Sequence, residues 1–188
     1  PINYSVITNI DNEHLDYYKN FKNLKQAFIK FINKTPPIGK AIVCWDDLNL
    51  RKILTTIKIK NFLSYGFHAN CNYQIFNERF SPEFSTFDLK IKSRGFKKII
   101  IKKFNLNLLG KHNILNATAA IAICLNLGIK VNVIKVALKN FSGVQRRLTK
   151  IFSKNQRDFY DDYAHHPTEI KEVLDGVKNV YKDYEKIC

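Results

Sequence analysis

The chain has 188 residues, of which 45% are hydrophobic and 25% are charged, and it carries a formal net charge of +15. This length can enclose one substantial core and part of a second, and the composition excludes an intrinsically disordered protein. The sequence has neither a run of 18 apolar residues nor the layout of a signal peptide, so we expect a cytoplasmic protein with no membrane partner.

The positive charge is one signature of nucleic-acid binding, because basic side chains that neutralise phosphates release counterions. Here, however, the lysines alternate with or flank apolar residues, as in residues 58–60 and 97–103. That pattern is typical of the solvated faces of exposed strands. We therefore expect no nucleic-acid partner.

The first third of the chain alternates strand and helix patterns, which indicates an α/β fold. We expect a buried strand from Tyr4 to Ile10, an amphipathic helix from Asn23 to Asn33, and a buried strand from Ala41 to Trp45. The turn residues at 36–39 separate the last two. Asp46 and Asp47 can cap a short helix that runs through Ile53.

From Phe62 to Leu109 the pattern changes to β and predicts a β-rich insertion. Ser-Pro and Ser-Arg-Gly turns separate three expected strands, at Tyr73–Phe80, Phe84–Ile91 and Phe96–Leu108. Two helices follow, at His112–Leu127 and Val131–Phe141, and Gly128 suits the left-handed end of the first.

The remaining chain predicts a strand pair that ends at Gln156–Tyr160 and an amphipathic helix that opens near Pro167. Between them two acids, a tyrosine and two histidines stand together at residues 161–166. A strand that ends in acids and leads into a helix N-terminus is where α/β proteins place nucleotide and metal chemistry. The alternative is a polar turn before an apolar helix face.

The four cysteines lie far apart and form neither a Cys-x-x-Cys pair nor a metal-ligand spacing. Cys44 and Cys124 lie in apolar runs and are typical of small core residues. The chain contains no Met, begins at Pro1 and ends at Cys188. We therefore expect a piece of a longer protein.

Four segments, in order, carry a resemblance to a known family. They are Gly-x-His-Asn-x-x-Asn-x-x-Ala-Ala from Gly110, Phe-x-Gly-x-x-Arg-Arg from Phe141, Asp-Asp-Tyr-Ala-His-His-Pro from Asp161, and the segment 6–16. Together they resemble the Mur ligases, which use ATP to add amino acids to the cytoplasmic precursor of bacterial peptidoglycan. The His-His-Pro-Thr-Glu-Ile form is most similar to the branch that adds L-alanine to UDP-N-acetylmuramate.

The resemblance implies a central ATP-binding domain over residues 1–148, incomplete at its N-terminus. It also implies that residues 149–188 begin a Rossmann-like C-terminal ligase domain. The expected fold class is thus α/β, a Mur-ligase-type ATPase domain with a β-rich insertion and the first strands and helix of a second domain.

For ATP, the resemblance implies contacts from Asn113, Asn116, Arg147 and Asp162. Asn113 and Asn116 share one face at the start of a helix, and an amide offers the donor and acceptor that adenine needs; the alternative is helix capping. Arg147 has a fork of donors that matches phosphate oxygens, and its alternative is a solvated charge. Asp162 would accept hydrogen bonds from the ribose, while Asp161 is more typical of a structural acid.

For catalysis and substrate binding, the resemblance implies roles for His14, Arg147, Tyr163 and His165. His14 would help to hold a divalent cation, taken as Mg²⁺, near the γ-phosphate, although a lone loop histidine is more often only exposed. Tyr163 and His165 would contact the substrate. His166 can instead cap the following helix or pack beneath the loop.

The implied function is ATP-dependent ligation of L-alanine to UDP-N-acetylmuramate through an acyl phosphate. Three alternatives stay open: a murein-tripeptide recycling ligase, an inactive remnant with weak nucleotide binding, and a basic nucleic-acid-binding domain. No Gly-x-x-x-x-Gly-Lys-[Ser/Thr] motif occurs in these residues. We therefore expect the 188-residue chain alone to be inactive.

Overall fold

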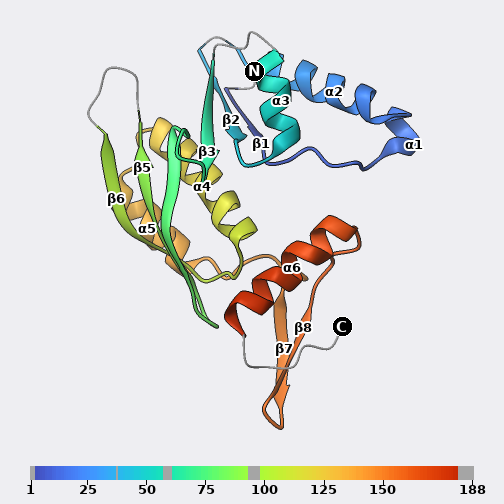
Figure 1. Cartoon of the computed structure of the whole chain (residues 1–188). Helices are drawn as coiled ribbons and strands as arrows, with labels where there is room; N and C mark the ends of the chain where they lie inside the picture. Colours follow the sequence, from blue (N-terminus) through green and yellow to red (C-terminus); the bar gives the residue numbers. More distant parts are fainter. Residues whose placement is uncertain (1–2, 37, 57–60, 93–97, 182–188) are drawn as a thin grey trace.

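The computed structural model describes residues 3–36, 38–56, 61–92 and 98–181, which form two sheets and six helices (Figure 1). One sheet has six strands whose spatial order follows the chain, from β1 to β6, and the other pairs β7 with β8. The predicted Ser-Arg-Gly turn and the first residues of the strand predicted from Phe96 lie outside the described residues, as does Cys188.

The first half of the large sheet is parallel. β1 (Tyr4–Ile7), β2 (Lys40–Cys44) and β3 (Phe62–Gly66) are joined through α1 (Leu15–Tyr18), α2 (Phe21–Asn33) and α3 (Leu48–Thr56). Ala41 to Cys44 are all buried, which shows that helices cover both faces of the sheet at β2.

The strand predicted to reach Ile10 ends at Ile7. Ile10 is nevertheless 1% exposed, and its carbonyl accepts a hydrogen bond from Asn49 Nδ2 at 2.9 Å. The apolar run therefore continues past the strand because a loop residue, held by α3, completes the core.

The second half of the sheet is antiparallel and is formed by β4 (Tyr73–Phe80), β5 (Ser85–Ile91) and β6 (Ile99–Leu106). β3 and β4 are parallel and pair only where one ends and the other begins, with Tyr65 opposite Tyr73 and Gly66 opposite Gln74. The β-rich segment thus continues the same sheet instead of forming a separate layer.

Two helices, α4 (Lys111–Asn126) and α5 (Val131–Asn140), follow the sheet, and α4 joins its two halves. Ala119 and Ala122 pack in the core of the parallel half, whereas Ile114 and Ile121 pack in the core of the antiparallel half. Gly128 ends the helix with φ 78°, as predicted.

The end of the described chain forms a smaller unit. β7 (Thr149–Lys154) and β8 (Arg157–Asp161) make a hairpin that points away from the large sheet, and α6 (Pro167–Val180) lies between this hairpin and the rest of the molecule (Figure 1). Among the described residues, no helix is both long and apolar enough to span a bilayer.

Candidate functional site

The acids that follow β2 are held by backbone donors. Asp46 accepts hydrogen bonds from the N–H groups of Phe67 at 2.7 Å and His68 at 3.2 Å. Asp47 accepts from the Leu50 N–H at 2.7 Å and caps α3, as predicted. Burial raises the pKa of Asp47. Both carboxylates therefore act in the local structure.

The turn after β1 places four polar side chains in succession. Asn12 donates its N–H to Asp11 Oδ1 at 2.7 Å, and the Glu13 N–H donates to the Asp11 carbonyl at 2.9 Å. His14 follows with a left-handed backbone (φ 56°), and its carbonyl accepts the N–H groups of Tyr17 and Tyr18. The backbone of His14 therefore starts α1 while its side chain is exposed.

Magnesium needs several oxygen ligands. In the part of the chain that the structure describes, no group of three or more His, Cys, Asp or Glu side chains is arranged to hold a metal ion. His14 therefore belongs to no such group among the described residues.

The predicted adenine contacts lie at the start of α4. The Asn113 side chain donates from Nδ2 to the Leu109 carbonyl at 2.7 Å, which satisfies one of the turn's carbonyls. Asn116, one turn later, is exposed. Asn113 therefore has a structural contact in addition to any ligand contact, and Asn116 is the freer of the two.

His112 was not among the predicted site residues, although it stands inside the Gly-x-His-Asn motif. Its Nδ1 is buried and lacks a hydrogen-bond partner among the described residues. Burial lowers the pKa of this imidazole, while the nearby charges of Glu172 and Asp162 oppose that effect and the charge of Arg147 adds to it. His112 thus lies close to two of the residues predicted to bind ATP.

An open cavity of about 610 Å³ lies beside this point, between the start of α4 and the second half of α6. Its lining is polar and carries both signs of charge, from Lys111, Glu172, Asp175, Gly176, Lys178 and Asn179. None of the predicted site residues lines it.

Asp162 joins two segments of the site. Its Oδ2 accepts the Leu148 N–H at 2.6 Å and its Oδ1 accepts the Ala164 N–H at 2.7 Å. Each carboxylate oxygen has a second lone pair, so this clamp leaves acceptor capacity toward solvent.

The two neighbouring arginines point to different partners. Arg146 has φ 60°, its Nε lies 3.6 Å from Asp161 Oδ2, and its guanidinium lies 4.8 Å from the centre of the Tyr163 ring. Arg147 Nη1 lies instead 3.5 Å from Glu169 Oε1. Arg146 therefore supports the loop, and Arg147 faces the first turn of α6.

The two histidines of the loop also diverge. The His165 side chain is 71% exposed, and its ring lies 5.0 Å from that of Tyr163. The backbone N–H of His165 donates to Glu169 Oε2 at 3.4 Å. Although partial burial opposes the shift, the His165 N–H and the Arg147 guanidinium lower the pKa of Glu169. His166 turns the other way, toward Asp11 and Glu13.

Known proteins match this sequence along its whole length. The family model of the Mur ligase middle domain matches residues 1–124. Over all 188 residues the chain is 52% identical to UDP-N-acetylmuramate–L-alanine ligase of Pelagibacter ubique (strain HTCC1062). It covers 40% of that protein, and it spans about two fifths of the length of the curated relatives that it matches.

Solved structures show the same fold. The chain superposes on UDP-N-acetylmuramate-alanine ligase from Thermotoga maritima with a TM-score of 0.73 and 27% identity, over 96% of this chain and 39% of that one. A murein peptide ligase from Psychrobacter arcticus 273-4 gives a TM-score of 0.62 and 25% identity, over 94% of this chain and 35% of that one.

Proposed function

Because the chain belongs to the Mur ligase family, we propose that it is part of an ATP-dependent ligase that joins L-alanine to UDP-N-acetylmuramate. The observation that carries this proposal is the 52% identity to an alanine ligase, which extends over the whole chain and includes the loop from Asp161 to Pro167.

In the proposed reaction, the carboxylate of the muramate lactyl group attacks the γ-phosphorus of ATP and releases ADP. The acyl phosphate that forms is then attacked by the amine of L-alanine. A tetrahedral intermediate collapses, phosphate leaves, and the amine loses a proton, so that an amide bond remains.

For the nucleotide, we assign the adenine contacts to Asn116 and Asn113, the ribose contact to Asp162 and a phosphate contact to Arg147. Support comes from the environment of His112, whose titration is influenced by both Arg147 and Asp162 and which stands beside Asn113 in the chain. The start of α4 and the 147–162 region therefore form one neighbourhood.

Arg147 already faces an anion, the Glu169 carboxylate, at 3.5 Å. Because a guanidinium can bind a phosphate with two parallel hydrogen bonds, a bound nucleotide would compete with Glu169 for this fork. Glu169 would then hold Arg147 near the site until ATP arrives.

For the acceptor substrate, we assign contacts to Tyr163 and His165. Both are exposed, at 51% and 71%, and their rings lie edge to face. They therefore present a polar and aromatic surface, and His165 shares the Glu169 carboxylate with Arg147. A Mg²⁺ ion would neutralise phosphate charge, and His14 would supply one of its ligands.

We further infer that the domain boundary lies near Leu148. β7 begins at Thr149, and the two-stranded sheet shares no strand pairing with the six-stranded sheet in the described ranges. By this assignment residues 1–148 hold the adenine-binding helix, and residues 149–188 open the second domain in a cytoplasmic enzyme.

The second candidate, a murein-tripeptide recycling ligase, is supported by the fold shared with the murein peptide ligase. The 52% identity to an alanine ligase over the whole chain favours the first candidate. The decisive experiment assays the complete protein with ATP, UDP-N-acetylmuramate and either L-alanine or the tripeptide. Phosphate release with L-alanine supports the first candidate, release only with the tripeptide supports the second, and release with neither contradicts both.

A further inference from the structure

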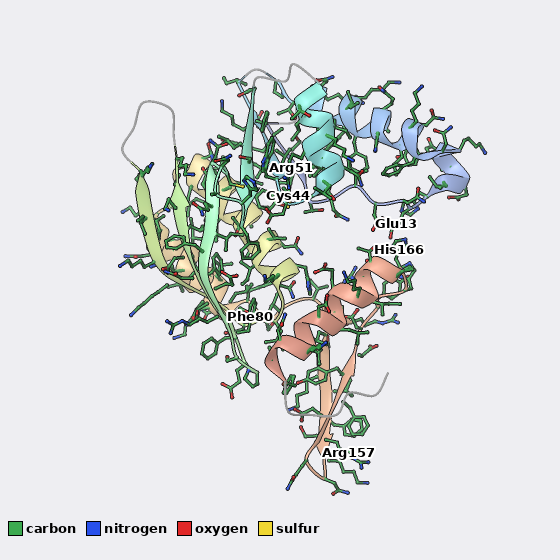
Figure 2. All side chains as sticks on the ribbon, viewed as in Figure 1. Glu13, Cys44, Arg51, Phe80, Arg157 and His166 are labelled. Atoms are coloured by element: carbon green, nitrogen blue, oxygen red, sulfur yellow. The ribbon has the colours of Figure 1, made fainter. Side chains whose placement is uncertain are left out.

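His166 connects two segments that are far apart in the sequence. Its Nδ1 lies 3.5 Å from Glu13 Oε1 and 3.8 Å from Asp11 Oδ2. In Figure 2 Glu13 and His166 face each other, one from the turn after β1 and the other from the start of α6. All three side chains are partly shielded, since between 24% and 38% of their surface is exposed.

A second contact supports the first. A hydrogen bond from the Thr168 side chain lowers the pKa of the Asp11 carboxyl. Partial burial raises this pKa, whereas the Asn12 N–H and the nearby His166 lower it further. The two carboxylates also lie at the positive end of the α6 dipole. The turn after β1 is thus held by two side chains from the first residues of one helix.

The same nitrogen of His166 has a third neighbour. The Thr168 N–H lies 3.4 Å from Nδ1, which makes His166 the N-cap of α6. A ring nitrogen either accepts through its lone pair or donates its proton, but not both at once. When Nδ1 carries no proton, it can accept the Thr168 N–H and cap α6. When Nδ1 carries a proton, it can donate to the carboxylates of Asp11 and Glu13 instead.

The contact of His166 with Asp11 and Glu13 lies between segments that carry predicted site residues. His14 follows Glu13 directly, and Tyr163 and His165 lie just before His166. We propose that His166 is a positioning residue that holds the turn carrying His14 against the loop carrying Tyr163 and His165. The contact does not depend on the proposed function, but the purpose given to it does, because the roles of those three residues come from that proposal.

Two substitutions in the 188-residue chain separate the bridge from the cap. His166→Asn keeps a good N-cap but removes the group that reaches the carboxylates. His166→Lys keeps a cation that can reach them but cannot accept the Thr168 N–H. His165→Asn is the matched control, since His165 is a neighbouring, exposed histidine that contacts Tyr163 and Glu169 instead.

The measurement is amide hydrogen exchange of the chain without nucleotide, at about pH 6.5, where an ordinary histidine is half charged. The reporters are the amides of Asn12 and Glu13, which are hydrogen-bonded inside the turn, and the amide of Thr168. His166→Asn should speed exchange in the turn by about three- to tenfold and leave the Thr168 amide protected. His166→Lys should speed exchange of the Thr168 amide and leave the amides of Asn12 and Glu13 protected.

Two further readouts test positioning. Glu13→Gln should also speed exchange in the turn, and His166→Asn should add little to it in the double variant. The NMR signal of the His14 ring should shift in His166→Asn and not in His165→Asn. If the turn exchanges normally in His166→Asn, or if His165→Asn has the same effect, the bridge is wrong and His166 is only a helix cap. Neither measurement depends on ligase activity. The contact of His166 with Asp11 and Glu13 can therefore be tested even if the proposed function is wrong.

Discussion

Gly110 and Gly176 bring α4 and α6 into backbone contact: a Cβ placed on Gly176 would lie 3.3 Å from the Cα of Gly110. The same approach encloses His112, whose ring would lie within 3.0 Å of a Cβ on Gly110. The smaller unit therefore docks on the larger one at the start of the helix that carries Asn113 and Asn116.

The first prediction concerns this docking. Gly176→Val should lower the free energy of unfolding by about 1–3 kcal/mol, because the new methyl groups meet backbone atoms that cannot move aside. Helix propensity alone would favour Val over Gly by a few tenths of a kcal/mol. A fall in the free energy of unfolding would therefore be due to the contact with Gly110. Urea denaturation followed by circular dichroism measures it. Lys178→Val, on an exposed position of the same helix, is the control and should change stability by roughly 0.5 kcal/mol.

The second prediction follows from the buried imidazole of His112. Burial lowers its pKa in the folded protein below the ordinary value of about 6.5, so the unfolded chain binds a proton there that the folded chain does not. Stability that is present above about pH 6.5 should be lost as the pH falls toward the folded pKa. Unfolding free energies measured between about pH 7.5 and 5, above the main carboxyl titrations, should show this decline.

His112→Gln should flatten the pH dependence in that window, because the titrating group is gone. His68→Gln, which removes an exposed histidine, should leave the decline unchanged. An equally steep decline in His112→Gln would mean that another group is responsible.

The third prediction separates the two asparagines in the complete enzyme. Asn116→Ala should chiefly raise the KM for ATP, because an adenine contact is made equally in the ground and transition states. Asn113→Ala should in addition cost about 1 kcal/mol of stability, since it removes the hydrogen bond to the Leu109 carbonyl. Steady-state kinetics and thermal unfolding give the two readouts. An unchanged KM in Asn116→Ala would leave that residue as a surface amide.

The fourth prediction compares the two arginines. Arg147→Ala in the complete enzyme should lower kcat on the order of 10²-fold, as expected for a group that stabilises phosphate charge during transfer. Arg146→Ala should leave kcat within a few-fold and cost about 0.5–1 kcal/mol of stability through its lost contacts with Tyr163 and Asp161. Equal and severe losses of kcat in both variants would contradict the assignment of one arginine to the nucleotide.

A fifth prediction uses the 188-residue chain alone. Without a phosphate-loop motif in these residues, ATP and adenosine should bind within about tenfold of each other, a difference of roughly 1.4 kcal/mol. Isothermal titration with both ligands, with and without Mg²⁺, measures the ratio. A much larger preference for ATP would show that this chain holds a stronger phosphate site than the single contact assigned to Arg147.

The long helices were predictable because their apolar spacing is a local property. α2, α4 and α5 begin and end within two residues of the predicted positions. Strand pairing is not local, so the sequence predicts a β-rich segment but not which strand it joins. Periodicity identifies β4, β5 and β6, but only the register between Tyr65 and Tyr73 shows that they extend the first sheet.

The roles of the site residues stay predictions. The motifs predict which residues gather near α4 and in the loop before α6, because within each motif those residues lie together in the sequence. Two kinds of contact left no local signal. His166 meets Asp11 and Glu13 from the opposite end of the chain, and His112 is enclosed by a helix that begins more than fifty positions later.

The change from parallel to antiparallel pairing at β4 also bears on how the chain folds. β4, β5 and β6 are consecutive neighbours joined by short connections, whereas each parallel pairing of β1, β2 and β3 must wait for an intervening helix to cross the sheet. Closing short loops costs less chain entropy, and such contacts form faster. Folding should therefore start in the middle of the chain, with the antiparallel strands and α4 as a template on which the N-terminal strands assemble later. In pulse-labelling hydrogen exchange during refolding, amides of β5 should gain protection before those of β1.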